Sequence, residues 1–303
     1  MHPENKKRIE CLGELTETKT ESGEKFLEII HKKEYIEHVK ESCVKKEHLD
    51  PDTITSAGSY KAAIHAVGAT VLASQTNNFA VVRPPGHHAH PGKSSGFCIF
   101  NNIAIATQKL VNEGKKVLIF DFDGHLGDGT MNIFYDTDKV LYWSLHQFPA
   151  FPFRGNVNEI GEGRGRGYTV NNPLPPRSGD DIFMEAIERF MPAAEQFKPD
   201  VVGVSAGFDA HQLDLLLDLR VSATAYYKIG EILRKRFKNV FATLEGGYNI
   251  EMLPKCLFNF MNGINDKKIY YNEQATDSRI IAIDEFQARM SAVEKNLSEY
   301  WKI

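Results

Sequence analysis

Residues 117–130 read VLIFDFDGHLGDGT, an apolar run that changes abruptly into a polar turn. Five of the first six residues are apolar, which is typical of a strand buried on both faces of a sheet. The residues that follow are acids and a histidine separated by glycines, namely Asp121, Asp123, His125 and Asp128. This stretch predicts a buried strand whose end brings several charged groups together.

The segments on either side alternate between short β-rich runs and helical patterns. We expect strands over residues 79–83, 115–122, 140–146, 200–209 and 239–248. We expect helices over residues 101–114, 180–197 and 222–237, the last beginning at a serine cap. Because continuous apolar strands alternate with helices, the predicted fold class is α/β, a parallel sheet flanked by helices on both faces.

The remaining parts of the chain follow other patterns. The first 75 residues are expected to be mostly helical, and residues 279–303 to form a closing amphipathic helix. Residues 149–179 are rich in glycine, proline and arginine. We expect one long loop there, which is either functional or a plain surface excursion. No internal repeat divides the chain, so we expect one catalytic domain over residues 1–303.

The composition argues against several classes of protein. The net charge is −4 and no basic stripe is present, so we expect no direct binding to nucleic acid or to a membrane surface. No apolar run is long enough for a membrane span, and the N-terminus lacks the apolar core of a signal peptide, so we expect a cytoplasmic protein. The four cysteines form no CxxC pair and are expected to be reduced: Cys11, Cys43, Cys98 and Cys256.

Polar residues follow four of the predicted strands at the point where each strand ends. These ends read RPPGHHAH, DFDGHLGDG, FDAH and EGGY. In open α/β sheets, ligands bind outside the carboxyl ends of the strands, which lie along one edge. We therefore expect a single site at that edge, built from His87, His88, Asp121, Asp123, His125, Asp128, Asp209 and Tyr248.

Three of these residues predict a metal site. Several carboxylates share a buried site only if they are protonated, paired or bound to a cation. Asp123 and His125 are two residues apart, so in an extended segment their side chains point the same way. With Asp209 they make three ligands, the pattern of a catalytic divalent-metal site with open positions. Zn²⁺, Fe²⁺, Co²⁺ and Mn²⁺ all suit such ligands. The alternative is that these carboxylates cap helices.

The other residues at these strand ends suit acid–base chemistry. His87 and His88 follow a Pro-Pro-Gly bend, and Asp121 and Asp128 could each orient one imidazole. Tyr248 follows two glycines and could donate a hydrogen bond to a carbonyl oxygen as it becomes an oxyanion. The alternatives are a pair of surface histidines and an aromatic residue that caps the sheet.

Six blocks of the chain resemble the histone deacetylase family, which has the arginase/deacetylase fold. In order they read RPPGHHA, SGFCIFNNIAIA, DFDGHLGDGT, SLHQFP, SAGFDAH and EGGYN, and all lie within residues 50–260. RPPGHH without an intervening tryptophan resembles the class II and prokaryotic members. The resemblance implies that Asp123, His125 and Asp209 bind zinc, and that water activated there attacks an acyl amide.

The resemblance also implies the remaining catalytic roles. His88 matches the general base and His87 its tandem neighbour. Asp128 and Asp121 match their respective carboxylate partners, and Tyr248 matches the tyrosine that polarises the amide carbonyl.

Substrate-binding residues and two structural potassium ions are implied in the same way. Gly96, Phe97 and Phe151 match the tunnel that grips an acyl-lysine stem. Asp50 matches a rim acid that binds the substrate backbone, and Leu216 matches the acidic gatekeeper of polyamine-selective relatives. The inner potassium site matches Asp121, Asp123, His125, Ser144 and Leu145, and the outer one Phe134, Thr137 and Val140.

Four features depart from the family pattern. Leu126 stands where most relatives have a second histidine, and FPFRG places Phe153 and Arg154 near the pocket mouth. Residues 214–219 read DLLLDL in place of D-P-L-G-D-L. The opening MHPENKKRIE resembles the segment after the family's first strand, so we expect that edge strand to be missing or trimmed.

We therefore expect a zinc-dependent deacetylase that acts on acetyl-lysine or a related small acylated amine. The nearest alternative is an acetylpolyamine amidohydrolase, which the neutral Leu216 disfavours. A second alternative is a catalytically impaired homologue that binds a metal or a partner, as Leu126, Phe153 and the missing strand suggest. An arginase-like hydrolase is disfavoured, because its two-metal site needs further aspartate ligands. No pattern predicts an oligomeric state.

Overall fold

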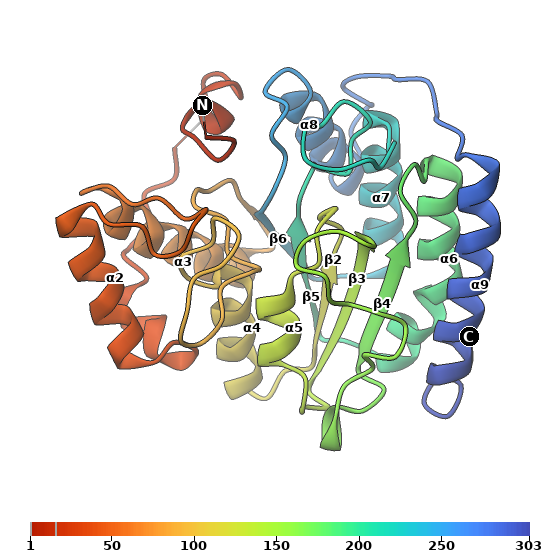
Figure 1. Ribbon diagram of the computed structural model, residues 1–303, viewed down its shortest axis with the longest axis horizontal. Helices are drawn as coiled ribbons and strands as arrows, with labels where there is room; N and C mark the ends of the chain where they lie inside the picture. The colour runs from red at the N-terminus through yellow and green to blue at the C-terminus, as the bar shows by residue number, and fades with distance from the viewer. Residues whose placement is uncertain (1, 16) are drawn as a thin grey trace.

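The computed structural model describes residues 2–15 and 17–303, and within them six strands form one parallel sheet. Their order in the sheet is β1-β6-β5-β2-β3-β4 (Figure 1). The strands are β1 (Phe79–Ala80), β2 (Val117–Asp121), β3 (Val140–Gln147), β4 (Thr169–Leu174), β5 (Val201–Ala206) and β6 (Val240–Leu244). The predicted fold class is confirmed.

Helices cover both faces of the sheet (Figure 1). One face carries α2 (Lys33–Lys45), α3 (Ser59–Thr76), α4 (Asn102–Asn112) and α5 (Asp128–Ile133). The other face carries α6 (Asp180–Phe197), α7 (Ala223–Arg236), α8 (Leu253–Ile264) and α9 (Ile280–Leu297). The shorter elements are α1 (Lys7–Glu10) and the 3₁₀ turns η1 (Glu24–Ile29), which packs against α3 and α4, and η2 (Gly163–Gly165).

The strand sequence explains why both faces are covered. Successive side chains of a strand point to opposite faces, so every residue of an apolar run needs a helix on its own side. In β2, Leu118 and Phe120 belong to the core on the α6–α9 side, whereas Val117 and Ile119 belong to the core on the α2–α5 side. All five residues of β2 are buried, which places its acidic end deep in the molecule.

Most predicted elements are present with boundaries shifted by a few residues. The helix predicted over residues 180–197 is α6, and the helix predicted to begin at a serine cap is α7, where the Ser222 hydroxyl accepts the amide of Ala225. The N-terminal quarter is mostly helical and α9 closes the chain, as expected. None of the described helices is both long and apolar enough to cross a membrane.

Two predictions about strands were wrong. The strand predicted over residues 79–83 is only Phe79–Ala80, and the chain leaves the sheet three residues before Pro84 and Pro85, which cannot donate to a sheet. The tract predicted as one loop over residues 149–179 contains β4, which pairs with β3. Its sequence TVNNPL predicts a strand only weakly, since asparagine and proline are depleted in strands. Pro173 is tolerated there because β4 is an edge strand, covered by α9.

The strand order positions the site. β2 lies between β5 and β3, and β5 lies next to β6. The segments after β2, β5 and β6 therefore meet at one edge of the sheet, as the rule for open α/β sheets requires.

Candidate active site

The centre of the site is a buried cluster of Asp123, His125 and Asp209. One donor atom from each side chain lies within 4.8 Å of the other two. Nδ1 of His125 is 2.6 Å from Oδ2 of Asp209 and 3.5 Å from Oδ1 of Asp123. The structure thus brings together the three predicted metal ligands, which come from the ends of β2 and β5.

Backbone amides fix the two carboxylates. The amide of Gly124 donates to Asp209 Oδ1 at 2.7 Å, and the amide of Gly246 donates to Asp123 Oδ2 at 2.7 Å. A Cβ atom at Gly207 would lie 1.9 Å from Asp123 Oδ2, so only glycine lets the β5 turn approach this closely. Each carboxylate also keeps one oxygen near His125, since Oδ1 of Asp123 and Oδ2 of Asp209 are the atoms closest to its Nδ1.

The charge distribution of this cluster fits a divalent metal ion. Burial, together with the charge of Asp123, raises the pKa of Asp209 to about 7. Burial opposes protonation of His125, but the carboxylates of Asp209 and Asp123 outweigh it and raise the pKa of His125 to about 10. Two carboxylates and one imidazole crowded in a desolvated site are stabilised by a cation, and the Asp₂His set suits a hard or borderline ion.

His87 is paired with Asp121, as predicted. Its Nδ1 lies 3.3 Å from Asp121 Oδ2, and the hydroxyl of Tyr142 donates to the same oxygen at 3.0 Å. Burial opposes protonation of His87, but the carboxylates of Asp123, Asp121 and Glu245 outweigh it and hold its pKa well above the ordinary value. His87 therefore suits the role of a proton donor.

His88 is paired with Asp128, whose second oxygen binds a third imidazole. Nδ1 of His88 donates to Asp128 Oδ1 at 2.8 Å, and Nε2 of His90 donates to Asp128 Oδ2 at 2.9 Å. Burial and the charge of His87 lower the pKa of His88 to about 4, despite the opposing effect of Asp128. A neutral imidazole at pH 7 can accept a proton, so His88 suits the role of a general base.

Three aromatic rings surround these polar groups. The ring of Phe151 stands 5.1 Å from that of His88, and the rings of Phe97 and Tyr248 are 5.7 Å apart, edge to face. A Cβ atom at Gly96 would lie 2.6 Å from His88 Cδ2, so glycine allows this segment to reach the imidazole. Burial raises the pKa of Tyr248 well above its ordinary value, which keeps the phenol protonated and able to donate.

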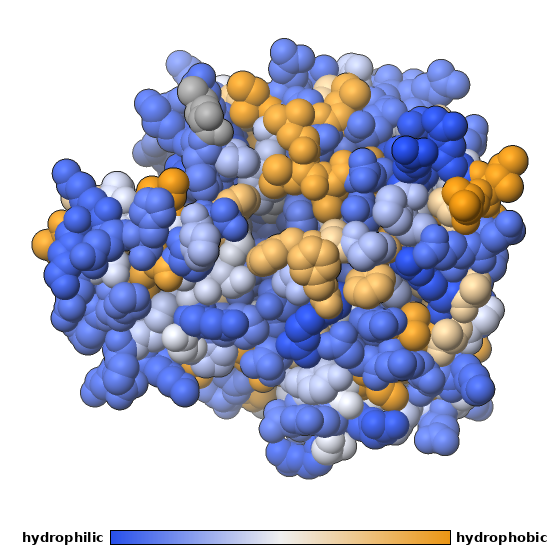
Figure 2. Space-filling model, viewed as in Figure 1, coloured by the Kyte–Doolittle hydropathy of each residue, from blue (hydrophilic) through white to orange (hydrophobic). Residues whose placement is uncertain are grey.

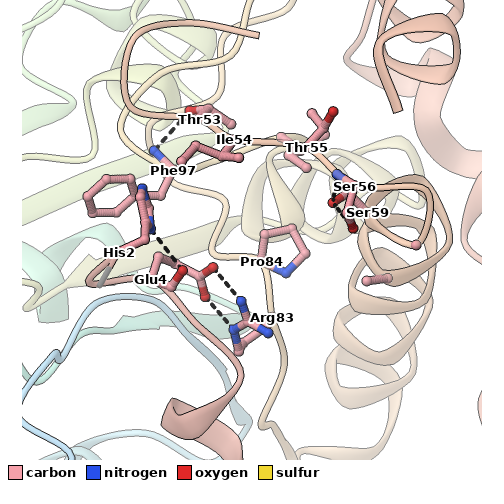
Figure 3. A pocket seen from close by; sticks show the side chains of 13 residues that line it. His2, Glu4, Thr53, Ile54, Thr55, Ser56, Ser59, Arg83, Pro84 and Phe97 are labelled. Carbon is pink, nitrogen blue, oxygen red and sulfur yellow. Dashed lines mark hydrogen bonds and ion pairs between the residues drawn. The ribbon is translucent and has the colours of Figure 1, made fainter. Parts of the chain in front are cut away.

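A cavity of about 400 Å³ lies beside Phe97, on the side of the N-terminal segment (Figure 3). The ring of His2 packs edge-on against Phe97 at 4.8 Å, and Glu4 forms an ion pair with Arg83 through contacts of 2.5 and 2.6 Å. The amide of Phe97 donates to Thr53 Oγ1 at 3.1 Å. These contacts hold Phe97 in place from the side of the N-terminal segment.

Sequence reasoning missed four residues that support the site. Besides Tyr142 and His90, these are Glu245 and Arg8. Oε2 of Glu245 accepts the amides of Gly86 and His87 at 2.6 and 3.1 Å, and burial raises the pKa of Glu245 to about 7. One signal for Glu245 was available, because an acid ends an apolar strand there, as Asp121 does.

Arg8 is fully buried beneath the EGGYN segment. Its guanidinium donates to the carbonyl oxygens of Gly247 and Glu245 at 2.7 and 2.5 Å, and lies 4.9 Å from the centre of the Tyr248 ring. No local pattern distinguished Arg8 from the other basic residues of the N-terminal segment. These contacts hold the EGGYN segment, and with it Tyr248, in place.

The proposed rim acid and the inner potassium residues lie near the site, whereas the outer potassium residues lie around the start of β3, at the other end of the strand. Asp50 accepts the hydroxyl of Ser94 at 2.7 Å, and Thr53 of the same turn holds Phe97. Leu216 is partly exposed on the segment after β5. The potassium residues lie along β2, α5 and β3, with Asp121 and Ser144 as register partners; they are Asp121, Asp123, His125, Phe134, Thr137, Val140, Ser144 and Leu145. Both potassium sites stay predictions.

Two of the four departures from the expected pattern lie in different parts of the molecule. Leu126 is buried in the apolar core with Met131 and Phe134, so it acts as a packing residue. Phe153 is exposed at the surface, and Arg154 is paired with Glu159 at 2.8 Å. The first departure is therefore internal and the second belongs to the mouth of the site.

Comparisons with known proteins agree with this geometry. A family profile described as the histone deacetylase domain matches residues 2–264. A probable deacetylase of Archaeoglobus fulgidus is 35% identical over 299 residues, covering 90% of this chain and 82% of that protein. Histone deacetylase 10, chloroplastic, of Oryza sativa subsp. japonica is 36% identical over 307 residues, covering 84% of this chain and 68% of that protein. The crystal structure of the HDA15 HD domain superimposes with a TM-score of 0.90 at 28% identity, covering 99% of this chain and 90% of that chain.

Proposed function

This chain belongs to the histone deacetylase family, and on that premise we propose that it is a zinc-dependent amidohydrolase that removes acetyl groups from acetyl-lysine or a related acylated amine. The observation that carries the proposal is the convergence of the Asp123/His125/Asp209 cluster with two histidine–carboxylate pairs. A structural metal site alone would not need these two pairs beside it.

Asp123, His125 and Asp209 would hold the metal ion. Zinc, or Fe²⁺ or Co²⁺ in its place, would supply Lewis-acid polarisation of the amide carbonyl and acidify a water molecule. A potassium ion at the predicted inner site, which includes Asp121, would neutralise part of the remaining charge there. The buried carboxylates of the cluster support this proposal, because they need a cation to stay charged.

The chain's own residues would divide the proton transfers. His88, neutral and oriented by Asp128, would accept a proton from the attacking water. His87, protonated and held by Asp121, would donate a proton to the leaving amine. Tyr248, whose phenol stays protonated, would donate a hydrogen bond to the oxyanion. The products are acetate and a free amine.

The surroundings favour a lysine-like substrate over a polyamine. Phe97, Phe151 and Gly96 would grip an uncharged aliphatic stem, and Asp50 would bind the substrate backbone. A polyamine needs a free carboxylate near the mouth to pair with its second ammonium group. The segment 213–217 offers only Asp214, whose oxygens already accept backbone amides, among them those of Tyr248 and Leu215.

A deacetylation assay tests the proposal directly. The purified protein is expected to release acetate from an acetyl-lysine peptide with a kcat/KM at least ~tenfold above that for N-acetylputrescine. Activity is expected to disappear on chelation and in His88→Ala, while His38→Ala, an exposed histidine on α2, stays active. A preference for N-acetylputrescine would favour the polyamine alternative.

The alternative of an impaired homologue predicts another result. A protein that binds zinc stoichiometrically and is folded, yet hydrolyses neither substrate, would be a metal-binding or partner-binding relative. Leu126 and Phe153 motivate this alternative, and the complete set of His87, His88 and Tyr248 argues against it. A cytoplasmic location is likewise a proposal, to be checked by fractionation of cells that express the protein.

A further inference from the structure

The mouth of the site carries an unusual amount of exposed apolar surface. We call Phe151, Phe153, Leu213, Leu215 and Leu216 the apolar rim. All five are exposed, Phe153 and Leu215 to 72% and 76%. Figure 2 shows apolar side chains gathered at the centre of this face. Contiguous exposed apolar patches on soluble proteins mark sites of interaction.

The rim begins at the catalytic residues. The ring of Phe151 is 5.1 Å from that of His88. On the other side, a Cβ atom at Gly124 would lie 2.4 Å from Cδ1 of Leu217, so Leu217 packs directly on the turn between Asp123 and His125. The rim is therefore the outward continuation of the site, and whatever extends from a bound acyl-amine would contact it.

Backbone bonds hold the leucines in place. Oδ1 of Asp214 accepts the amides of Leu215 and Leu216 at 2.7 and 3.3 Å. Its Oδ2 accepts the amides of Tyr248 and Asn249 at 2.7 and 3.0 Å. The turn is thus tied to the Tyr248 segment, and it presents its leucines to solvent beside the site.

The phenylalanine side of the rim is held as well. The amide of Phe153 donates to the carbonyl of Ala150 at 2.7 Å, and Phe153 has a φ of 62°, a conformation that phenylalanine seldom adopts. In this turn the ring of Phe153 is exposed to solvent. Arg154 beside it is neutralised by Glu159 at 2.8 Å.

The two segments that carry the apolar rim offer no free charge to a strongly charged partner. The segments 150–154 and 213–217 contain two charged residues, Asp214 and Arg154. Asp214 accepts four backbone amides and Arg154 is ion-paired, so neither is free for a ligand. A charged side chain placed against the rim would lose water without gaining a partner.

We propose that the apolar rim selects substrates in which the acylated lysine is flanked by apolar side chains. The inference rests on the proposed deacetylase function and adds a preference for the residues around the acyl-lysine. The apolar neighbours of the acyl-lysine would cover Leu213, Leu215 and Phe153 and bury them from water.

Matched peptides test the inference. Four peptides carry acetyl-lysine between two leucines, two serines, two glutamates or two lysines. The leucine peptide is expected to have a kcat/KM roughly tenfold above that of the serine peptide, and the difference is expected in KM rather than in kcat. The glutamate and lysine peptides are expected to have a lower kcat/KM than the serine peptide.

Variants then locate the effect. The double variant Leu215→Gln/Phe153→Gln is expected to reduce the leucine-to-serine ratio to about threefold or less. Ile281→Gln, which replaces a side chain 78% exposed on α9, is the matched control and should keep the wild-type ratio. Thermal unfolding confirms that each variant is folded.

Two outcomes overturn the inference and are distinguishable. Equal kcat/KM for the leucine and serine peptides, or a ratio that the double variant leaves unchanged, removes the rim preference and keeps the deacetylase. Absence of hydrolysis for all four peptides by the zinc-loaded protein removes the proposed function, and the rim preference with it.

Discussion

The base and the mouth of the site are built on opposite principles. At the base, Asp123, His125 and Asp209 are buried, and each carboxylate accepts a backbone amide. At the mouth, the apolar rim is exposed, and the two charged residues of its segments, Asp214 and Arg154, already have partners. The base depends on charge positioned within fractions of an ångström, whereas the mouth depends only on apolar area.

This difference suggests which parts of the molecule tolerate change. A substitution at the base removes a partner from a desolvated group, which costs far more than the loss of one exposed contact. Substitutions at the mouth are expected to alter which substrates bind without abolishing hydrolysis.

The largest effect is expected at the metal cluster. Asp209→Asn removes a charged ligand, so zinc content should fall well below one per chain and kcat by about a thousandfold or more. Metal analysis and acetyl-lysine hydrolysis measure both. The control Asp284→Asn, at an exposed aspartate of α9, should match the wild type. A variant that keeps both zinc and activity would remove Asp209 from the ligand set.

Leu126 tests whether packing and chemistry are separable at the base. Leu126→Ala should lower the free energy of unfolding by about 3 kcal/mol, because it leaves a cavity in the core. Zinc content and kcat of the folded variant should stay within about threefold of the wild type. Urea unfolding measures the stability, and zinc analysis and activity assays measure the chemistry. Val44→Ala, at an exposed position of α2, is the neutral control. Loss of zinc in Leu126→Ala would mean that Leu126 supports the ligands.

Asp128 tests the general base. Asp128→Asn should reduce kcat about a hundredfold, because the neutral asparagine amide, unlike the carboxylate, does not stabilise the positive charge that His88 gains when it accepts a proton. His90→Gln is the comparison, because glutamine can still donate to Asp128, and it should lower kcat by less than about fivefold. Equal losses in the two variants would indicate that Asp128 serves the loop structure rather than His88.

The buried His31 is expected to make the free energy of unfolding depend on pH. Its Nδ1 donates to the carbonyl of His90, its Nε2 accepts the amide of Asn101, and burial lowers the pKa of His31 to about 4. Below pH ~6.5 the unfolded chain gains a proton at this residue and the folded chain does not. The free energy of unfolding should therefore fall by about 2 kcal/mol between pH 6.5 and 5 through His31 alone.

Urea titrations of the wild type and His31→Gln over this range measure the effect. The variant should show the shallower dependence on pH, whatever its absolute stability. Parallel curves would assign the acid sensitivity to other buried histidines, such as His146, whose pKa burial also lowers to about 4.

Much of the fold was predictable because its signals are local. The helix predicted over residues 180–197 is α6, since its apolar residues recur with the period of a helix. The missed strand β4 has only a weak signal, because two asparagines and a proline, which are depleted in strands, follow its first two residues. It forms because β3 offers free backbone partners and α9 covers the edge.

The site was predictable to the extent that strand ends carry it. Asp121, Asp123 and Asp209 follow apolar runs, and parallel strands bring such ends together. His90 and Arg8 gave no comparable signal. His90 resembles an ordinary loop histidine until Asp128 is seen between it and His88.

The α/β fold, the edge of the sheet that carries the chemistry and the residue types gathered there follow from local patterns, because periodicity and spacing are properties of neighbours along the chain. Which distant groups support these residues depends on how the chain packs. Arg8 donates to Gly247 across 239 positions of sequence, and Asp214 accepts the amide of Tyr248 across 34. Such contacts depend on how whole elements pack, so the rim's orientation and the anchoring of the tyrosine loop follow from packing rather than from any local pattern.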